Sequence, residues 1–263
     1  MHARKRFGQN FLRDQEVIDR IVRAIKPESG QHLVEIGPGR GAMTWPLLQA
    51  LGQMTAIEID RDLVPLLREQ SQAHGQLSVV EADVLTVDFT ALAAGHMLRV
   101  VGNLPYNIST PVLFHLLDHA PVIQDMHFML QREVVERMAA PHGDKVYGRL
   151  SVALQARCKV EKLFRVMPGS FWPVPKVESA IVRLTPLHDP EREALAPALD
   201  RVVRAAFAQR RKTLSNALQG VLDPVTIASC GVRPDSRAEQ VPVSGFLELA
   251  RAWQSIADNQ APA

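Results

Sequence analysis

The chain has 263 residues, of which 46% are hydrophobic, and this length fits one large domain or one domain with a small appendage. It contains no run of about 18 apolar residues and no apolar segment of the signal-peptide kind after its basic start, which argues against membrane and secreted proteins. Its two cysteines, Cys158 and Cys230, form neither a disulfide framework nor a metal-ligand pattern, so we expect a cytoplasmic protein without a bound metal.

The net charge of +2 is unevenly distributed along the chain. Residues 1–26 carry a net charge of +4, residues 27–131 carry −7, residues 132–183 carry +5 and residues 184–263 carry zero. An acidic middle between basic flanks is compatible with a polyanion that lies across the rim of a site. Solvated helix faces explain the same distribution, so charge alone leaves nucleic-acid binding open.

Short apolar runs alternate with helical patterns through residue 140. Before the first run, apolar residues between Val17 and Ile25 recur at helical spacing behind Asp14, a good N-cap. The predicted strands are Leu33–Ile36, Met54–Ile59, Leu77–Val80, Leu98–Val101 and Met126–Leu130, and the predicted helices between them are Ala42–Leu51, Leu63–Ala73 and Val112–His119. This alternation predicts an α/β fold with a mainly parallel sheet and helices on both faces.

The pattern changes from residue 148 onward. It predicts a helix over Arg149–Arg157 and then two antiparallel strands, Lys159–Val166 and Ser179–Leu184, that close the sheet. Later helices are predicted at Leu195–Ala208, Lys212–Leu222, Pro224–Cys230 and Ser244–Ala257. Proline and charge interrupt the pattern near residues 186–190, so we expect an α/β domain over residues 1–186 and a helical domain over residues 187–263.

A glycine-rich segment, Gly37-Pro38-Gly39-Arg40-Gly41-Ala42, follows the first strand and opens a helix. Read literally, its spacing satisfies the dinucleotide fingerprint, and Glu58 follows at the distance of a ribose-binding acid. These features predict a cofactor that contains a nucleoside. They do not distinguish NAD from S-adenosylmethionine.

Two observations favour S-adenosylmethionine. Asp83 follows the third strand, where its carboxylate could accept a hydrogen bond from an adenine amino group, although it could instead serve as a helix N-cap. Arg40 is the one positive charge near the glycine loop in the sequence. A sulfonium cofactor needs no phosphate cradle, whereas a pyrophosphate would.

The tetrapeptide Asn103-Leu104-Pro105-Tyr106 follows the predicted strand that ends at Val101. It combines an amide oxygen, a turn stiffened by proline and an aromatic ring, which suits a grip on a flat base that bears an exocyclic amine. The Asn103 oxygen and a turn carbonyl can accept N–H bonds, and the Tyr106 ring can stack. An ordinary strand-to-helix turn explains the same four residues.

The glycine loop, Glu58, Asp83 and the tetrapeptide occur in the order used by adenine-N6 methyltransferases. Further segments accompany them: Phe7-Gly8-Gln9-Asn10-Phe11-Leu12, Phe171-Trp172-Pro173-Val174-Pro175-Lys176-Val177-Glu178-Ser179 and Gln209-Arg210-Arg211-Lys212-Thr213-Leu214. Together they closely resemble the small-subunit ribosomal RNA adenine N6-dimethyltransferases, the bacterial kasugamycin-resistance methyltransferase family. The resemblance runs from about Arg6 to Trp253.

This resemblance implies a Rossmann-like class I methyltransferase fold with a seven-stranded, mainly parallel sheet that contains an antiparallel strand, followed by a small all-α domain that binds rRNA. It implies transfer of methyl groups from S-adenosylmethionine to N6 of two adjacent adenosines in a hairpin loop near the 3′ end of 16S rRNA. The cofactor-binding residues it implies are Asn10, Leu12, Gly37, Gly39, Glu58, Asp83 and Asn103. Asn103, Leu104, Pro105 and Tyr106 would hold the target base, and Phe171 would cover its other face.

Arg210, Arg211 and Lys212 are predicted to contact RNA phosphates at the start of a helix, although a solvated helix face is nearly as good an interpretation. Arg149 and Lys176 are lesser candidates of the same kind. The expected partner is 16S rRNA within the 30S subunit or its precursor, bound by a monomer.

Three other interpretations remain. A ribosome-assembly factor could keep this fold without catalysis, but it would not need Asn103, Glu58 and Asp83. An NAD-dependent oxidoreductase would leave the tetrapeptide and the Phe171 segment without a role. A methyltransferase acting on a 23S rRNA adenine would share the chemistry and differ in its target.

Overall fold

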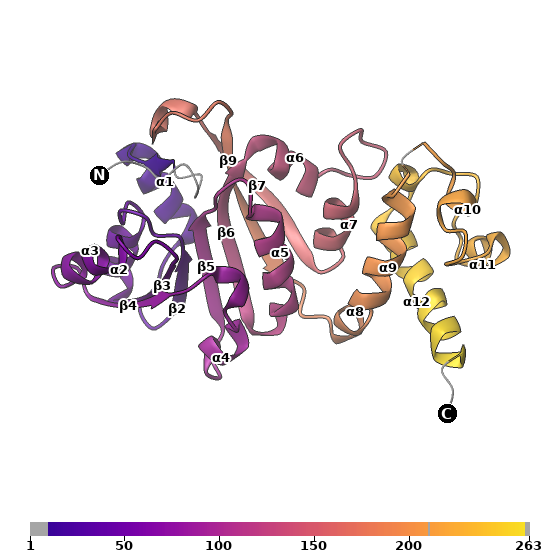
Figure 1. Ribbon diagram of the computed structural model, residues 1–263, viewed down its shortest axis with the longest axis horizontal. Helices are drawn as coiled ribbons and strands as arrows, with labels where there is room; N and C mark the ends of the chain where they lie inside the picture. The colour runs from indigo at the N-terminus through magenta and orange to yellow at the C-terminus, as the bar shows by residue number, and fades with distance from the viewer. Residues whose placement is uncertain (1–9, 210, 261–263) are drawn as a thin grey trace. The chain divides into compact units, whose positions relative to one another are not determined.

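A seven-stranded sheet organises the first part of the chain in this computed structural model, which describes residues 10–209 and 211–260. The strand order is β4-β3-β2-β5-β6-β9-β7 (Figure 1). The bounds are β2 His32–Ile36, β3 Gln53–Glu58, β4 Gln76–Glu81, β5 Leu98–Asn103, β6 Ile123–Gln131, β7 Cys158–Val166 and β9 Ser179–Pro186. β2 to β6 pair in parallel, and β9 pairs antiparallel to β6 with Val182 opposite Phe128.

The connections between these strands are mostly helical, as the sequence alternation predicts. The helices are α1 Gln15–Ile25, α2 Thr44–Leu51, α3 Val64–Ser71, α4 Phe89–Ala93, α5 Ser109–Asp118 and α6 Arg132–Met138, with short 3-10 turns η2 Val84–Thr86, η3 Ala120–Val122 and η4 Pro168–Ser170. α4, α6 and the 3-10 turns were not predicted, because they are too short to show a clear apolar period.

Helix α1 is fixed at both ends by side chains from elsewhere. The predicted N-cap, Asp14, accepts a hydrogen bond from the Val17 N–H at 3.3 Å and another from the Ser170 hydroxyl at 2.9 Å. At the other end the buried Arg99 guanidinium donates to the Ile25 carbonyl at 2.6 Å and pairs with Asp125. The helix is thereby attached to the sheet and to η4, which contains Ser170.

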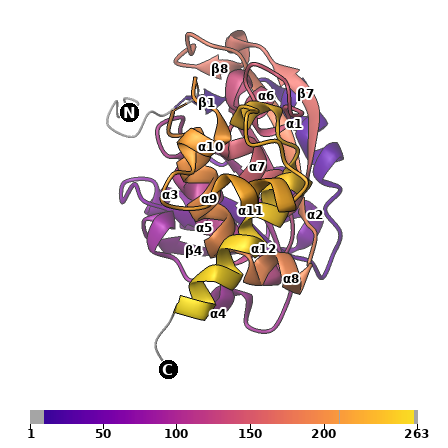
Figure 2. The same cartoon turned by 90° about the vertical axis from the view of Figure 1, so that its right-hand side faces the viewer.

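A two-stranded ribbon was not predicted from the sequence. β1, Phe11–Leu12, pairs antiparallel with β8, Phe171–Trp172 (Figure 2). Phe11 is opposite Trp172, and Leu12 is opposite Phe171. Strands of two residues carry no readable alternation, and the two partners are far apart in the sequence. The ribbon joins the N-terminal segment to the proline-rich segment after η4.

The chain divides into two compact units, and the division differs from the single predicted boundary. The first unit comprises the residues up to 135 together with 161–186, and the second comprises 136–160 together with the residues from 187 onward. Residues 136–160 join the second unit because they share its core: Val152 and Ala156 are buried in one cluster with Val202 and Phe246. The buried Tyr147 hydroxyl also donates to the Val241 carbonyl at 3.0 Å.

The second unit is helical (Figure 2). Its elements are α7 Arg149–Gln155, α8 Pro190–Ala194, α9 Ala196–Phe207, α10 Leu214–Ala217, α11 Pro224–Ser229, η5 Ala238–Gln240 and α12 Val243–Gln260. The helix predicted over Lys212–Leu222 is wrong in length, since α10 spans four residues. Gly220 has a φ of 79°, which a helix does not accommodate, and the backbone of Thr213 pairs with Arg237 instead of extending the helix toward its start. In the part of the chain that the structure describes, no helix is both long and apolar enough to cross a bilayer.

Candidate active site

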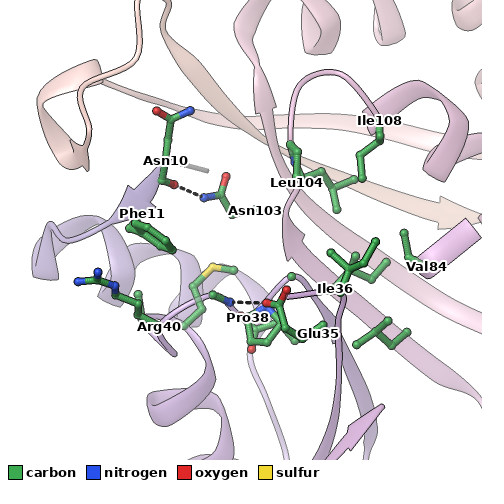
Figure 3. A pocket seen from close by; sticks show the side chains of 18 of the residues that line it. Asn10, Phe11, Glu35, Ile36, Pro38, Arg40, Val84, Asn103, Leu104 and Ile108 are labelled. Carbon is green, nitrogen blue, oxygen red and sulfur yellow. Dashed lines mark hydrogen bonds between the residues drawn. The ribbon is translucent and has the colours of Figure 1, made fainter. Parts of the chain in front are cut away.

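A cavity lies at the carboxyl ends of the parallel strands in the first unit (Figure 3). The structure brings all the predicted cofactor-binding residues to its wall: Asn10, Leu12, Gly37, Gly39, Glu58, Asp83 and Asn103. It brings four of the predicted target-base residues to the same wall: Asn103, Leu104, Pro105 and Tyr106. This is the edge at which open parallel sheets bind ligands.

The glycine loop between β2 and α2 forms one side of the cavity. Gly39 has a φ of 57°, and its N–H donates to Oε2 of Glu58 at 3.2 Å. Gly41 has a φ of +83°, and a Cβ at this position would lie 2.1 Å from the Trp45 ring. Gly39 lines the cavity without a side chain, so its backbone can be approached closely by a ligand, whereas Gly41 leaves room for the Trp45 ring.

Glu58 ends strand β3 with its carboxylate held in place. The residue is 5% exposed, and Oε1 accepts the Asp60 N–H at 2.8 Å while Oε2 accepts the Gly39 N–H at 3.2 Å. Burial raises the pKa of the carboxyl above its usual value, and the backbone hydrogen bonds oppose that shift. Each carboxylate oxygen has capacity for a further hydrogen bond, which suits a pair of neighbouring hydroxyl groups.

Asp83 both caps η2 and lines the cavity. Its Oδ1 accepts the Leu85 N–H at 3.0 Å, so the N-cap interpretation of this residue is correct. Oδ2 is the second acceptor of the same carboxylate, and the residue is exposed. The capping role and a hydrogen bond to a ligand are therefore compatible.

Glu35 is a cavity residue that the sequence predictions missed. It is 1% exposed, it accepts the Thr44 hydroxyl at 2.6 Å, and burial raises the pKa of its carboxyl to about 7. The signal was present in the sequence, since an acid inside the apolar run Leu33–Ile36 is unusual for a strand buried on both faces.

Asn103 ends β5 with its amide group oriented. Nδ2 donates to the Asn10 carbonyl at 3.0 Å (Figure 3). Because a carbonyl oxygen can only accept, the amide nitrogen must face Asn10 and the side-chain oxygen must be directed elsewhere. The Asn103 side chain thus offers an acceptor, Oδ1, at the cavity wall.

The turn after Asn103 is fixed by backbone and side-chain bonds. The Leu104 N–H donates to the Met129 carbonyl at 3.3 Å, and the Ile108 N–H donates to the Pro105 carbonyl at 3.2 Å. The Tyr106 hydroxyl lies 3.0 Å from the Ser179 hydroxyl, which is fully buried at the start of β9. Ser179 therefore holds the far end of the Tyr106 ring, a role that sequence reasoning did not assign.

Phe171 does not lie where the prediction placed it. Its side chain is 1% exposed and packs in the core of the first unit with Leu12, Ile18 and Leu47. Because Phe171 pairs with Leu12 in the ribbon, its ring is directed into the core and is not available to a base. The next residue, Trp172, is 45% exposed.

The predicted RNA-binding residues differ in their surroundings. Lys176, Arg211 and Lys212 are exposed, and Arg210 lies outside the described residues. Arg149 pairs with Asp200 at 2.9 Å within the second unit, so its guanidinium already has an acidic partner. Among residues 10–209 and 211–260, no cluster of three or more His, Cys, Asp or Glu side chains could hold a metal ion.

Comparisons with known proteins place the chain in a family. The profile of the family described as "Ribosomal RNA adenine dimethylase" matches residues 1–255. "Ribosomal RNA small subunit methyltransferase A" of Xanthomonas oryzae pv. oryzae is 58% identical over 253 residues, which cover 94% of this chain and 95% of that protein. The protein of the same name from Xanthomonas campestris pv. campestris is 58% identical over 254 residues, with the same coverage.

Solved structures agree with this fold. A dimethyladenosine transferase from Plasmodium falciparum superposes with a TM-score of 0.79 at 26% identity and covers 94% of this chain and 98% of that one. The 23S rRNA methyltransferase ErmE superposes with a TM-score of 0.72 at 28% identity and covers 93% and 100% of the two chains. The predicted class I methyltransferase fold is confirmed, and so is the predicted enzyme class. The chain belongs to the ribosomal RNA adenine dimethylase family.

Proposed function

We propose that this enzyme transfers methyl groups from S-adenosylmethionine to N6 of two adjacent adenosines in a hairpin loop near the 3′ end of 16S rRNA. The products are N6,N6-dimethyladenosines in the 30S subunit or its precursor. The observation that carries the proposal is the placement of the oriented Asn103 amide in the same cavity as the glycine loop, Glu58 and Asp83.

The donor set of the cavity fits S-adenosylmethionine. Glu58 would accept hydrogen bonds from the ribose hydroxyls, and Oδ2 of Asp83 would accept one from the adenine amino group. Gly37 and Gly39 would let the backbone approach the methionine part, and Asn10 and Leu12 line the same cavity. When bound, this cofactor supplies a methyl group on a positively charged sulfur, which an amine lone pair can attack.

Asn103 and Leu104 position the target nitrogen. The lone pair of adenine N6 is delocalised into the ring, so the amine is a weak nucleophile. Two N–H bonds, one to Asn103 Oδ1 and one to the Leu104 carbonyl, would hold the amine with its lone pair toward the methyl group. Positioning of this kind can supply roughly 7–11 kcal/mol in favourable systems. N6 becomes acidic once it is alkylated, so its proton can pass to water or to a carbonyl without a strong base.

Tyr106 would stack on the target base, with its ring fixed by the hydroxyl contact to Ser179. The base must leave its stack to enter the cavity, and an unpaired hairpin loop makes this step less costly than a duplex would. After the first transfer one N6–H remains, so the second transfer must proceed with one hydrogen bond fewer. The site therefore offers two acceptors, Asn103 Oδ1 and the Leu104 carbonyl, and only the unmethylated amine can donate to both.

The proposed target is the small subunit. The relatives that are 58% identical carry small-subunit names, whereas the 23S rRNA methyltransferase is 28% identical. Arg211 and Lys212 in the second unit, together with Arg210 and Lys176, would contact RNA phosphates. We further propose that the enzyme acts as a monomer in the cytoplasm, where its ribosomal substrate is assembled.

Labelled methyl transfer tests the proposal. The wild-type chain would be incubated with labelled S-adenosylmethionine and 30S particles from cells that lack this methylation, with naked 16S rRNA and 50S particles as comparisons. We expect label in 30S particles at two adjacent adenosines. Transfer to 50S particles alone would contradict the target, and transfer to none of the three would contradict the activity.

A further inference from the structure

The β1–β8 ribbon has two faces of different character. On one face Leu12 and Phe171 are opposite each other, and both are buried in the core of the first unit, with exposures of 6% and 1%. On the other face Phe11 is opposite Trp172. Directly opposed residues in an antiparallel pair project to the same side, with Cβ atoms about 4.5–5.5 Å apart. Trp172 therefore lies beside Phe11 on the face away from the core.

Phe11 shows where that face is directed. Its ring lines the cavity and lies 3.3 Å from the place where a Cβ of Gly39 would be. The Arg40 guanidinium lies over the same ring, 4.9 Å from its centroid (Figure 3). Trp172 lies beside Phe11 in the ribbon and is not one of the residues that line the cavity, so we place its indole at the rim, next to the wall formed by Phe11.

The rim at Trp172 has the chemistry of a base-stacking surface. Trp172 is 45% exposed, although a packed indole would bury a large apolar area. The exposed Lys176 supplies a positive charge in the same segment. Exposed aromatic rings beside cations are the usual platform for unpaired nucleotides, because every base has a face that can stack.

We propose that Trp172 is a stacking subsite for the unpaired base next to the target adenine in the RNA loop. This inference rests on the proposed function, which requires two adjacent adenosines to enter the same cavity in turn. While one adenine is at Asn103, its neighbour is also outside its stack and needs a surface. Trp172 provides that surface and so contributes to RNA affinity without contact with the reacting atoms.

Steady-state methylation of 30S particles tests this subsite. Base–aromatic stacking corresponds to about a 5- to 150-fold effect on binding. For Trp172→Ala we expect the KM for 30S particles to rise within this range, while kcat and the Kd for S-adenosylhomocysteine stay near wild type. Trp172→Phe should retain most of the affinity, and Trp172→Leu should lose as much as Trp172→Ala. Val174→Ala in the same segment is the matched control and should change the KM little.

Each other outcome contradicts the subsite. An unchanged KM in Trp172→Ala would show that no base stacks there, and a normal KM in Trp172→Leu would show an apolar contact without stacking. A weakened Kd for S-adenosylhomocysteine in all three variants would show that Trp172 acts through Phe11 on the cofactor. Inactive wild-type enzyme on 30S particles would instead contradict the proposed function, so the two failures are distinguishable.

Discussion

The cofactor side and the target side of the cavity differ in the hydrogen bonds that their polar side chains already make. On the cofactor side, Glu58 accepts two backbone N–H groups and Glu35 accepts the Thr44 hydroxyl. On the target side, Asn103 uses its amide nitrogen on Asn10 and presents its oxygen. The acids of the cofactor side are thus held by internal hydrogen bonds while Glu58 and Asp83 keep acceptor capacity for the cofactor, whereas the target side presents the oriented amide oxygen of Asn103 to the substrate. Substitutions on the first side should affect binding and stability, and substitutions on the second should affect turnover.

The largest effect is expected at Asn103. Asn103→Ala removes the acceptor that holds N6, and loss of one oriented group of this kind costs about 100- to 1,000-fold in kcat. We expect single-turnover methylation of 30S particles to fall by at least about 100-fold, while the melting temperature stays near that of the wild type. The exposed Asn107 gives the control, since Asn107→Ala removes the same amide four residues along the turn. Near-normal turnover in Asn103→Ala would show that the Asn103 oxygen is not needed to position N6.

Glu58→Gln should act on affinity. The Gln side chain would direct its N–H₂ group at one of the two backbone N–H groups that Glu58 accepts, so one hydrogen bond would be lost. Hydrogen bonds to a charged group contribute about 1.5–3 kcal/mol. Titration calorimetry should show a Kd for S-adenosylhomocysteine about 10- to 100-fold weaker, with kcat at saturating cofactor nearly unchanged. Glu81→Gln is the control, because Glu81 pairs with Glu58 in the β3–β4 register but is exposed and bonded to Arg61. A loss of kcat with an unchanged Kd for S-adenosylhomocysteine would show that Glu58 acts on turnover and not on cofactor affinity.

Glu35 should give the cofactor side a pH-dependent stability. Burial raises the pKa of its carboxyl from 4.5 to about 7, so its protonated form favours folding below pH 4.5 and that contribution is lost as the pH rises through 7. The loss amounts to roughly 3 kcal/mol, at 1.36 kcal/mol per pKa unit.

Glu35→Gln cannot ionise, so its free energy of unfolding relative to the wild type should rise between pH 4.5 and pH 7.5. Denaturant unfolding of the wild type and of Glu35→Gln at both pH values measures this difference. A difference between wild type and Glu35→Gln that stays constant with pH would mean that Glu35 ionises normally in the folded protein.

The smallest effect is expected at the exposed cations of the second unit that are predicted to contact RNA phosphates. Replacing both Arg211 and Lys212 with Ala should weaken binding to 30S particles and reduce the salt slope by about 0.7–0.9 for each lost phosphate contact. Arg251→Ala is the control, because that guanidinium is already paired with Glu191 and Glu248. Equal salt slopes for the wild type and the double variant would assign these two cations to an ordinary solvated surface.

Local patterns predicted much of this architecture. The strand predicted at Leu33–Ile36 is observed at His32–Ile36, and that predicted at Leu98–Val101 extends to Asn103, because buried parallel strands appear as apolar runs. Glu58 and Asn103 line the cavity because they stand at the carboxyl ends of β3 and β5, where the sequence predicted a site.

Contacts between distant residues could not be predicted in this way. The bonds of Asn10 to Asn103, Asp14 to Ser170 and Tyr106 to Ser179 each join segments that have no shared sequence pattern. The ribbon that buries Phe171 depends on the same long-range pairing. The placement of residues 136–160 in the second unit likewise follows from a shared core and not from composition.

Mass spectrometry of the rRNA nucleosides would identify the atoms that this enzyme methylates. Undermethylated 30S particles would be incubated with the wild-type enzyme and S-adenosylmethionine, and the 3′ region of the 16S rRNA would then be digested and sequenced. We expect N6,N6-dimethyladenosine at two adjacent positions in the hairpin loop with the wild type, and unmodified adenosines with Asn103→Ala. Methylation at another atom, or at adenosines outside that loop, would contradict the proposed function.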